Sequence, residues 1–134
     1  MDFSATWSGI TLADSSAGDV INTPRINGVP AVQVAAGLRA GAVKVFNRRN
    51  VTHTVAFTNK RPPFASPMLA AQFQAVHAIA FAAITDNATL AFSIGDKDYE
   101  LRDAVVTRRE IAEHFGTTIA YAYEITGGEL ADVT

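Results

Sequence analysis

The amino-acid sequence predicts a mainly β (α+β) fold, an antiparallel β-sandwich or barrel-like sheet with one α-helix packed on it. Several short runs alternate apolar and polar residues with the period of a strand. One run, at about residues 66–84, instead spaces its apolar residues three and four apart, as one face of a helix does. The order of strands, one helix and further strands favours an antiparallel sheet. We expect residues 1–134 to form one such domain, which suits this chain length.

The N-terminal part begins with a predicted strand and continues into a long loop. In residues 3–12 the side chains of Phe3, Ala5 and Trp7 alternate with small polar ones, and Gly9 marks a bulge. Residues 13–30 are rich in Gly, Asp, Asn, Ser and Pro and show no periodicity, which is typical of a loop. A loop of this length inside a small domain is usually functional or becomes ordered by a partner.

The next segment alternates again and predicts strands around Val32–Val34, Val43–Val45 and Val51–Phe57. The last two runs form either a hairpin that turns at residues 47–50 or one long bent strand. Residues 60–63, Lys-Arg-Pro-Pro, end the strand because proline donates no backbone hydrogen bond.

Ser66 and Pro67 predict the start of the helix, with serine as the N-cap and proline in the first helical position. Its apolar stripe comprises Leu69, Phe73, Val76, Ala80, Phe81 and Ile84. Alanines fill most other positions, so we expect this uncharged helix to be covered on most sides. Gln72, Gln74 and His77 argue against a membrane span, because burying such groups in lipid is costly.

The C-terminal part returns to strand periodicity around residues 90–94, 99–105 and 119–125, with a turn at 95–98. Gly127 and Gly128 close the last strand, and the final residues are interpreted as a tail. Residues 108–115 suit either a helix or a strand, and we favour a strand for at least the first half.

Composition and motifs argue against an enzyme. The net charge of −2 gives no electrostatic reason for specific nucleic-acid binding, and the absence of cysteine excludes disulfides and thiolate chemistry. His53, His77 and His114 lack metal-binding spacing, and no nucleophile elbow, P-loop or dinucleotide fingerprint occurs. The N-terminus lacks the basic and apolar regions of a signal peptide. We therefore expect no cofactor, metal or catalytic residue.

Charged residues comprise only 18% of the chain, which suggests that a partner covers part of the surface. Three basic pairs border strand ends or turns, and acidic residues of a neighbouring subunit, such as Asp14, Asp19 or Glu129, complement them. The alternative is that these basic pairs are ordinary solvated surface. The candidate subunit-interface residues are Asp14, Asp19, Arg25, Arg48, Arg49, Lys60, Arg61, Arg108 and Arg109.

Residues 43–128 resemble small tail proteins of tailed bacteriophages, the tail-tube and distal-tail family. The resemblance lies in Asn50 with the strand 51–55, the alanine-rich helix that begins near Ala65 and Ser66, residues 88–90, and the ending Tyr-Glu-Ile-Thr-Gly-Gly at 123–128. It implies a structural virion subunit, located in the tail, that forms a homo-oligomeric ring, commonly a hexamer. Its partners are other tail proteins, DNA passes through the channel only as cargo, and the 13–30 loop corresponds to the loop that reaches the next ring.

Two other functions remain open from the sequence. A hotdog-type thioesterase also wraps an antiparallel sheet around one apolar helix, but residues 67–84 contain no Asp or Glu. A ligand- or carbohydrate-binding β module would use exposed aromatic residues, for which Trp7, Tyr99, Tyr121 and Tyr123 are the candidates. Their alternation with small residues is explained more simply as the core face of a sheet.

Overall fold

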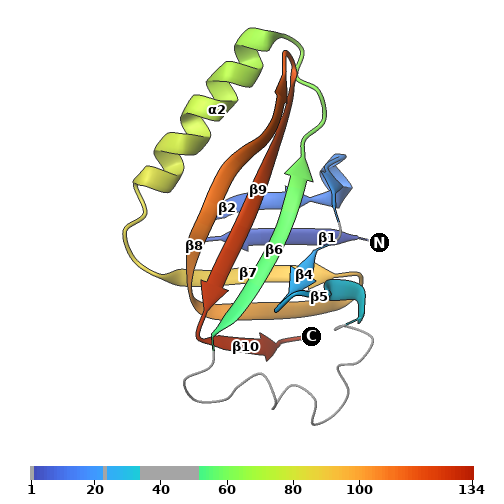
Figure 1. Cartoon of the computed structure of the whole chain (residues 1–134), viewed down its shortest axis with the longest axis vertical. Coiled ribbons are helices and arrows are strands. Elements are labelled where there is room, and N and C mark those ends of the chain that lie inside the picture. The colour runs from blue at the N-terminus through green and yellow to red at the C-terminus, as the bar shows by residue number, and fades with distance from the viewer. Residues whose placement is uncertain (1, 23, 34–51) are drawn as a thin grey trace.

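The computed structural model describes residues 2–22, 24–33 and 52–134. It is mainly β: one antiparallel sheet of ten strands that does not close into a barrel, with one substantial helix, α2 (Figure 1). This confirms the predicted fold class. The strands are β1 (Phe3–Trp7), β2 (Ile10–Asp14), β3 (Val20–Ile21), β4 (Arg25–Ile26), β5 (Val29–Pro30), β6 (His53–Lys60), β7 (Ala88–Ile94), β8 (Lys97–Phe115), β9 (Thr118–Gly127) and β10 (Glu129–Asp132). A short 3-10 helix, η1 (Ser15–Ala17), follows β2, and α2 spans Pro67–Ala82.

The long strand β8 folds the sheet into two facing layers. Its first part, up to Ala104, pairs with β7 and β10, whereas residues from Val105 onward pair with β9. The strand order is β2-β1-β7-β8-β9-β6-β4-β5, and β3 pairs with β6. In Figure 1 the strands of the β1 layer run across those of the β9 layer, which is the orthogonal type of sheet packing with a shared corner strand.

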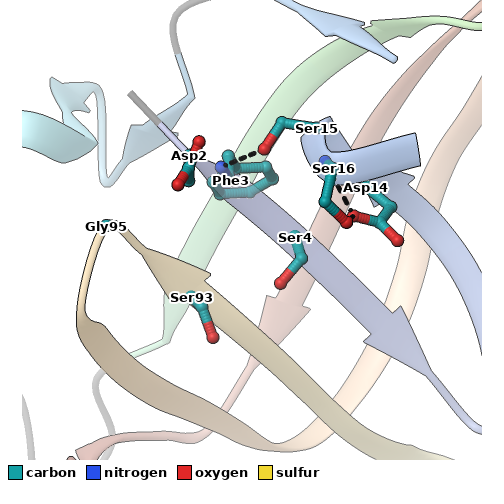
Figure 2. Close-up of a pocket in the computed structure, with 8 residues that line it drawn as sticks. All are labelled: Asp2, Phe3, Ser4, Asp14, Ser15, Ser16, Ser93 and Gly95. Atoms are coloured by element: carbon teal, nitrogen blue, oxygen red, sulfur yellow. Dashed lines mark hydrogen bonds between the residues drawn. The ribbon is translucent and has the colours of Figure 1, made fainter. Parts of the chain in front are cut away.

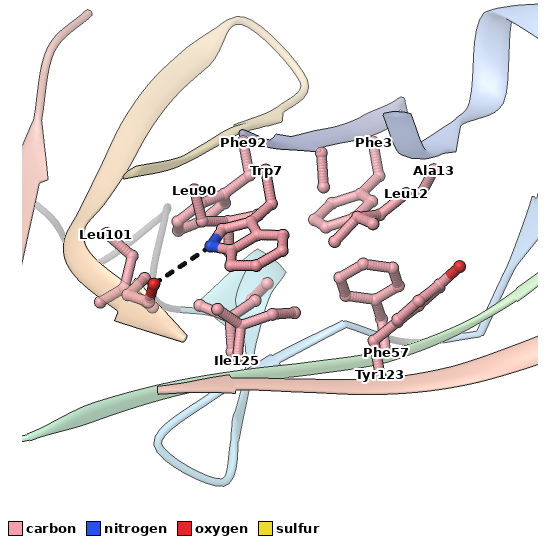
Figure 3. Packing of buried hydrophobic residues seen from close by; sticks show 14 of the residues in the cluster. Phe3, Trp7, Leu12, Ala13, Phe57, Leu90, Phe92, Leu101, Tyr123 and Ile125 are labelled. Carbon is pink, nitrogen blue, oxygen red and sulfur yellow. Dashed lines mark hydrogen bonds between the residues drawn. The ribbon is translucent and has the colours of Figure 1, made fainter. Parts of the chain in front are cut away.

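The hydrophobic core lies between these two layers. Figure 3 shows Phe3, Trp7 and Phe92 facing Phe57 and Tyr123 of the opposite layer. The rings of Phe3 and Phe57 meet edge to face, with centroids 5.1 Å apart. The indole nitrogen of Trp7 donates a hydrogen bond to the backbone oxygen of Ala104, 3.1 Å away. The apolar residues that alternate along the strands therefore point into this core, and the residues between them point to the outer faces of the layers.

Helix α2 begins as the sequence predicts. The Ser66 hydroxyl accepts a hydrogen bond from the Leu69 backbone nitrogen, and Pro67 occupies the first turn. The helix packs beside the sandwich, where Phe81 stacks on Trp7 with centroids 5.7 Å apart. Only Ala70 and His77 of the helix are buried. The expectation of a helix covered on most sides is thus wrong for the single chain.

Several other predictions require correction. The strand predicted at 3–12 is a hairpin, because Ser8 and Gly9 adopt positive φ angles (50° and 80°) in a two-residue turn. The predicted 13–30 loop contains η1 and the short strands β3, β4 and β5, of which β3 and β4 pair with β6. The predicted C-terminal tail contains β10, which pairs with β8.

Residues 108–115 are strand throughout, so the preference for a strand is confirmed over its full length. Residues 31–33 are helical, in contrast to the predicted strand. The predicted strand at 43–45 and the turn at 47–50 lie outside the described residues.

Candidate subunit interface

The outer side of α2 is a largely apolar surface, with Gln72 among its residues, that the described part of the chain leaves exposed. Met68, Leu69, Val76 and Ile79 have exposed fractions of 69%, 45%, 65% and 69%. We call these four residues the open face of α2. Between Arg61 and Asp86 the chain contains no Asp, Glu, Lys or Arg. Surface helices normally carry charged residues on the side that faces water, so this helix has the composition of one buried on both sides.

The inner side of α2 packs on the sheet through an aromatic cluster centred on His77. The imidazole centroid lies 5.3 Å from that of Phe73, 4.9 Å from that of Phe81 and 4.7 Å from that of Tyr121. Phe73 and Phe81 are one helical turn before and after His77, so the three rings form a continuous row. This row attaches the helix to β9.

His77 is also hydrogen-bonded through both ring nitrogens. Nε and Nη2 of Arg109 lie 3.1 and 2.7 Å from Nδ1. A guanidinium only donates, so Nδ1 is the acceptor, and the ring proton on Nε2 points to the Tyr123 hydroxyl at 3.2 Å. Burial, and then the positive charges of Arg109 and Arg61, lower the pKa of His77 to about 4. The ring is therefore neutral near neutral pH.

A bulge in β8 explains why Arg109 points inward instead of Arg108. Val106 lies opposite the core residue Ile125, and strict alternation would bring residue 108 to the same face. The register shifts between Val106 and Arg108, so that Arg109 pairs with Tyr123 while Arg108 pairs with Glu124. A second shift, between Ile111 and Glu113, follows in the same strand. The sequence pattern alone does not reveal these shifts.

Arg61 and Arg109 rest on the aromatic cluster. The guanidinium of Arg61 lies 4.4 Å from the centroid of the Phe73 ring, and that of Arg109 lies 4.9 Å from Phe81 and 4.8 Å from Tyr121. Within the described residues neither arginine has a carboxylate within ion-pair distance, and Nε of Arg61 is buried without a hydrogen bond. We call these two residues the arginine pair.

The neighbouring basic residues are neutralised within the chain. Lys60 pairs with Glu113 at 3.3 Å, and Arg108 pairs with Glu110 and Glu124. Asp19 is buried, and its carboxylate accepts hydrogen bonds from the Asp14 backbone and the Asn59 side chain. Asp19 is therefore held at the margin of the core of the single chain, and its place at a subunit interface stays a prediction. Arg25 is exposed and donates to the Gly28 backbone oxygen, while Arg48 and Arg49 lie outside the described residues.

An acidic cavity lies at the end of β1 away from α2. Figure 2 shows that Asp2 and Asp14 line it together with hydroxyl-bearing residues of β1, η1 and β7. Its volume is about 130 Å³, and its lining residues are Asp2, Phe3, Ser4, Asp14, Ser15, Ser16, Ser93 and Gly95. Asp14 accepts hydrogen bonds from the backbone and hydroxyl of Ser16. We call this cavity the acidic notch.

The second half of β8 is a free sheet edge. Residues from Val105 to Phe115 pair with β9 on one side and have no strand on the other among the described elements. An unpaired edge presents backbone donors and acceptors that another strand can use. Ile111 and Phe115 on this strand are exposed apolar residues. The same stretch carries the charged residues Arg108, Glu110 and Glu113.

The remaining features of the described chain are buried aromatic residues and a surface hollow. The described residues contain no cluster of three His, Cys, Asp or Glu side chains that could hold a metal ion, and no described helix is long and apolar enough to cross a membrane. Trp7, Tyr99, Tyr121 and Tyr123 are all buried, as expected for core residues. A hollow of about 400 Å³ lies on the outer face of β6 and β9 beside the Lys60–Glu113 pair.

No model of a known protein family matches this chain, and no curated protein matches it either.

Proposed function

We propose that this protein is a structural subunit of a bacteriophage tail that assembles with copies of itself into a ring around the DNA channel. The observation that carries this proposal is the open face of α2, which exposes Met68, Val76 and Ile79 on an uncharged helix. Exposed apolar residues gathered on one side of a helix, as these are around the polar Gln72, mark a protein interaction site. A neighbouring subunit would remove it from water.

The free edge of β8 supports the same proposal. In the single chain this edge leaves backbone hydrogen-bonding groups without a strand partner among the described elements, and a neighbouring copy is the simplest source of one. The edge and α2 belong to the same side of the molecule, since Arg109 of β8 hydrogen-bonds His77 of α2. One neighbour would therefore cover both.

The resemblance of residues 43–128 to tail-tube and distal-tail proteins supplies the kind of assembly, a ring that is commonly a hexamer and lies in the virion tail. The mild net charge of −2 suits a channel through which DNA passes without binding. In this proposal the protein binds copies of itself and other tail proteins, and it catalyses no reaction.

The first test is the mass of the purified full chain in solution, measured by light scattering over a range of concentrations, with negative-stain images of the particles. We expect rings or stacked rings. A chain that stays monomeric at high concentration, alone and with the adjacent tail proteins, would contradict the proposal.

A substitution then tests whether the open face of α2 is the interface. Val76→Glu places a charge in the middle of this face, and we expect it to shift the assembly to monomers, because a buried unpaired carboxylate costs several kcal/mol. Val20→Glu is the matched control, since Val20 is equally exposed (63% against 65%) but lies on β3. Circular dichroism checks that both variants fold. Assembly by Val76→Glu at wild-type concentrations would show that this face is not the interface.

A further inference from the structure

The outer face of the layer that contains β6 and β9 has a hollow on the side away from α2. Tyr121 and Tyr123 of β9 point to the inner face, where they contact rings of α2. Ala122 lies between them in the strand, so its side chain points to the outer face. There it lines a hollow of about 290 Å³ together with Ala56 and Thr58 of β6. We call this the outer hollow. It and the open face of α2 lie on opposite sides of one layer.

The outer hollow suits an uncharged helix in its charges and in its length. Arg108 at its margin is paired with Glu110 and Glu124 within the chain, so a helix without charged residues can cover it without leaving this cation unpaired. The open face of α2, from residue 68 to 79, is about 16 Å long at 1.5 Å per residue. Residues 56–60 of β6, along the hollow, extend about 13 Å at 3.3 Å per residue.

Two charged residues beyond these surfaces define a direction. Arg25 is exposed, lines the outer hollow and pairs in register with Ala56, at one end of it. Asp86 is exposed and follows the C-terminal end of α2. Among the described residues no carboxylate lies within ion-pair distance of Arg25, and no cation within that distance of Asp86. The C-terminal end of a helix also favours a nearby cation.

We propose that the open face of α2 docks on the outer hollow of a second copy of this chain, with Asp86 beside Arg25 of that copy. The proposal rests on the proposed function and names the two surfaces that meet between neighbouring subunits. The occupant is a second copy because its outer hollow complements α2 in its neutral surface, in its length and in the cation at one end.

This contact is heterologous, because it joins two different surfaces that face opposite ways. Repetition of a heterologous contact generates either a closed ring or an open filament. Sheet layers and helices would alternate through the assembly, so that α2 is covered on both sides, as its lack of charged residues indicates. The apolar contact supplies most of the affinity, and the charged pair at its rim sets the orientation.

The first test fills the outer hollow and follows assembly by light scattering. Ala122→Arg places a bulky cation there, and we expect the concentration needed for assembly to rise on the order of tenfold, as the contact becomes overpacked. Ala91→Arg is the matched control on the outer face of the other layer. Both alanines lie directly opposite a glutamate of β8, Glu110 for Ala122 and Glu100 for Ala91, so each new arginine has a carboxylate beside it in the monomer. Circular dichroism checks that both variants fold.

The second test links the two surfaces covalently. The chain contains no cysteine, so introduced cysteines give an unambiguous cross-link. Val76→Cys together with Ala122→Cys in one chain should yield a ladder of disulfide-linked multimers when the assembled protein is mildly oxidised. The two positions lie on opposite sides of the layer, so they cannot be bridged within one chain. Each single variant has one cysteine and can form nothing longer than a linked dimer.

A charge exchange tests the orientation. Asp86→Lys and, separately, Arg25→Glu should each raise the concentration needed for assembly roughly threefold, the size of effect expected for an exposed ion pair. The two substitutions in one chain should restore assembly, since every contact then has an inverted pair. Asp96→Lys, the same change of charge in the exposed turn between β7 and β8, is the control and should assemble as the wild type does.

The outcomes separate this inference from the proposed function. If the wild type forms rings and Ala122→Arg forms them as readily as Ala91→Arg, or if the double cysteine variant gives no ladder, α2 binds another surface and the inference is wrong, while the proposed function stands. The inference is equally wrong if the charge-exchanged double variant assembles no better than Asp86→Lys alone. If the wild type forms no assembly, both fail.

Discussion

His77 connects α2 to the sheet as a neutral ring, and this makes stability depend on pH. Burial, Arg109 and Arg61 lower its pKa from 6.5 to about 4, so the unfolded chain binds a proton at a higher pH than the folded chain does. The free energy of unfolding should therefore fall as pH decreases from about 6.5 to about 4, by up to about 3 kcal/mol from this group, and should lose no more below that range.

Urea unfolding at several pH values measures this effect. In His77→Gln the amide can accept from Arg109 and donate to Tyr123 without titrating, so the decline between pH 6.5 and 4 should become shallower. His114→Gln, which removes an exposed histidine on β8, should retain the wild-type dependence. An unchanged slope in His77→Gln would assign the pH dependence to other groups.

Gly127 is required by space at the point where β9 meets the bend of β8. A Cβ atom there would lie 2.8 Å from the backbone oxygen of Arg102 and 2.7 Å from a side-chain carbon of Leu101. Gly127→Ala should therefore destabilise the fold by about 1–3 kcal/mol, as overpacking does. Gly128→Ala is the control, because a Cβ atom at Gly128 meets nothing within 4 Å. Equal midpoints of thermal unfolding for the two variants would contradict this explanation.

At the scale of the element, α2 depends on its N-terminal cap because it carries no charged residue to interact with the helix dipole. Ser66→Ala removes the acceptor for the Leu69 backbone nitrogen and should lower the free energy of unfolding by about 1 kcal/mol. Ser66→Asp keeps an acceptor and should restore it. Chemical unfolding monitored by the fluorescence of Trp7, the single tryptophan, is a suitable measurement because Trp7 stacks on Phe81 of this helix. Equal stability of the wild type and Ser66→Ala would show that the cap contributes little.

Elements with a long periodic pattern could be predicted from the sequence, and short ones could not. The helix and strands β6, β7 and β9 follow from alternation and capping residues that persist over seven or more positions. Strands β3, β4 and β5 have two residues each, which is too short for any period to be visible. They form because β6 offers an edge to β3 and β4, and β4 and β5 pair with each other, which is a tertiary effect.

The sequence shows which basic residues exist, but which of them form ion pairs within the chain is again a tertiary effect. The basic residues were identified in the sequence, but only the fold shows that Lys60 and Arg108 are neutralised while Arg61 and Arg109 rest on aromatic rings. A bulge, which no alternation pattern reveals, decides which arginine of β8 faces α2. A helix without charged residues on any side also gives no signal of which side remains open.

At the scale of the whole molecule, the proposed assembly depends on two features of one side, the open face of α2 and the free edge of β8. A contact made mainly by apolar side chains should not weaken as salt increases, whereas direct charge pairing would. Assembly is therefore expected to persist at high salt, which negative-stain images of particles at low and high salt would measure.

The bend of β8 has a mechanical consequence. Because this single strand of 19 residues belongs to both layers, neither layer can slide or detach without breaking hydrogen bonds in the other. A load applied to one layer reaches the other through continuous backbone and does not have to cross side-chain packing alone. The bent strand therefore couples the two layers against shear.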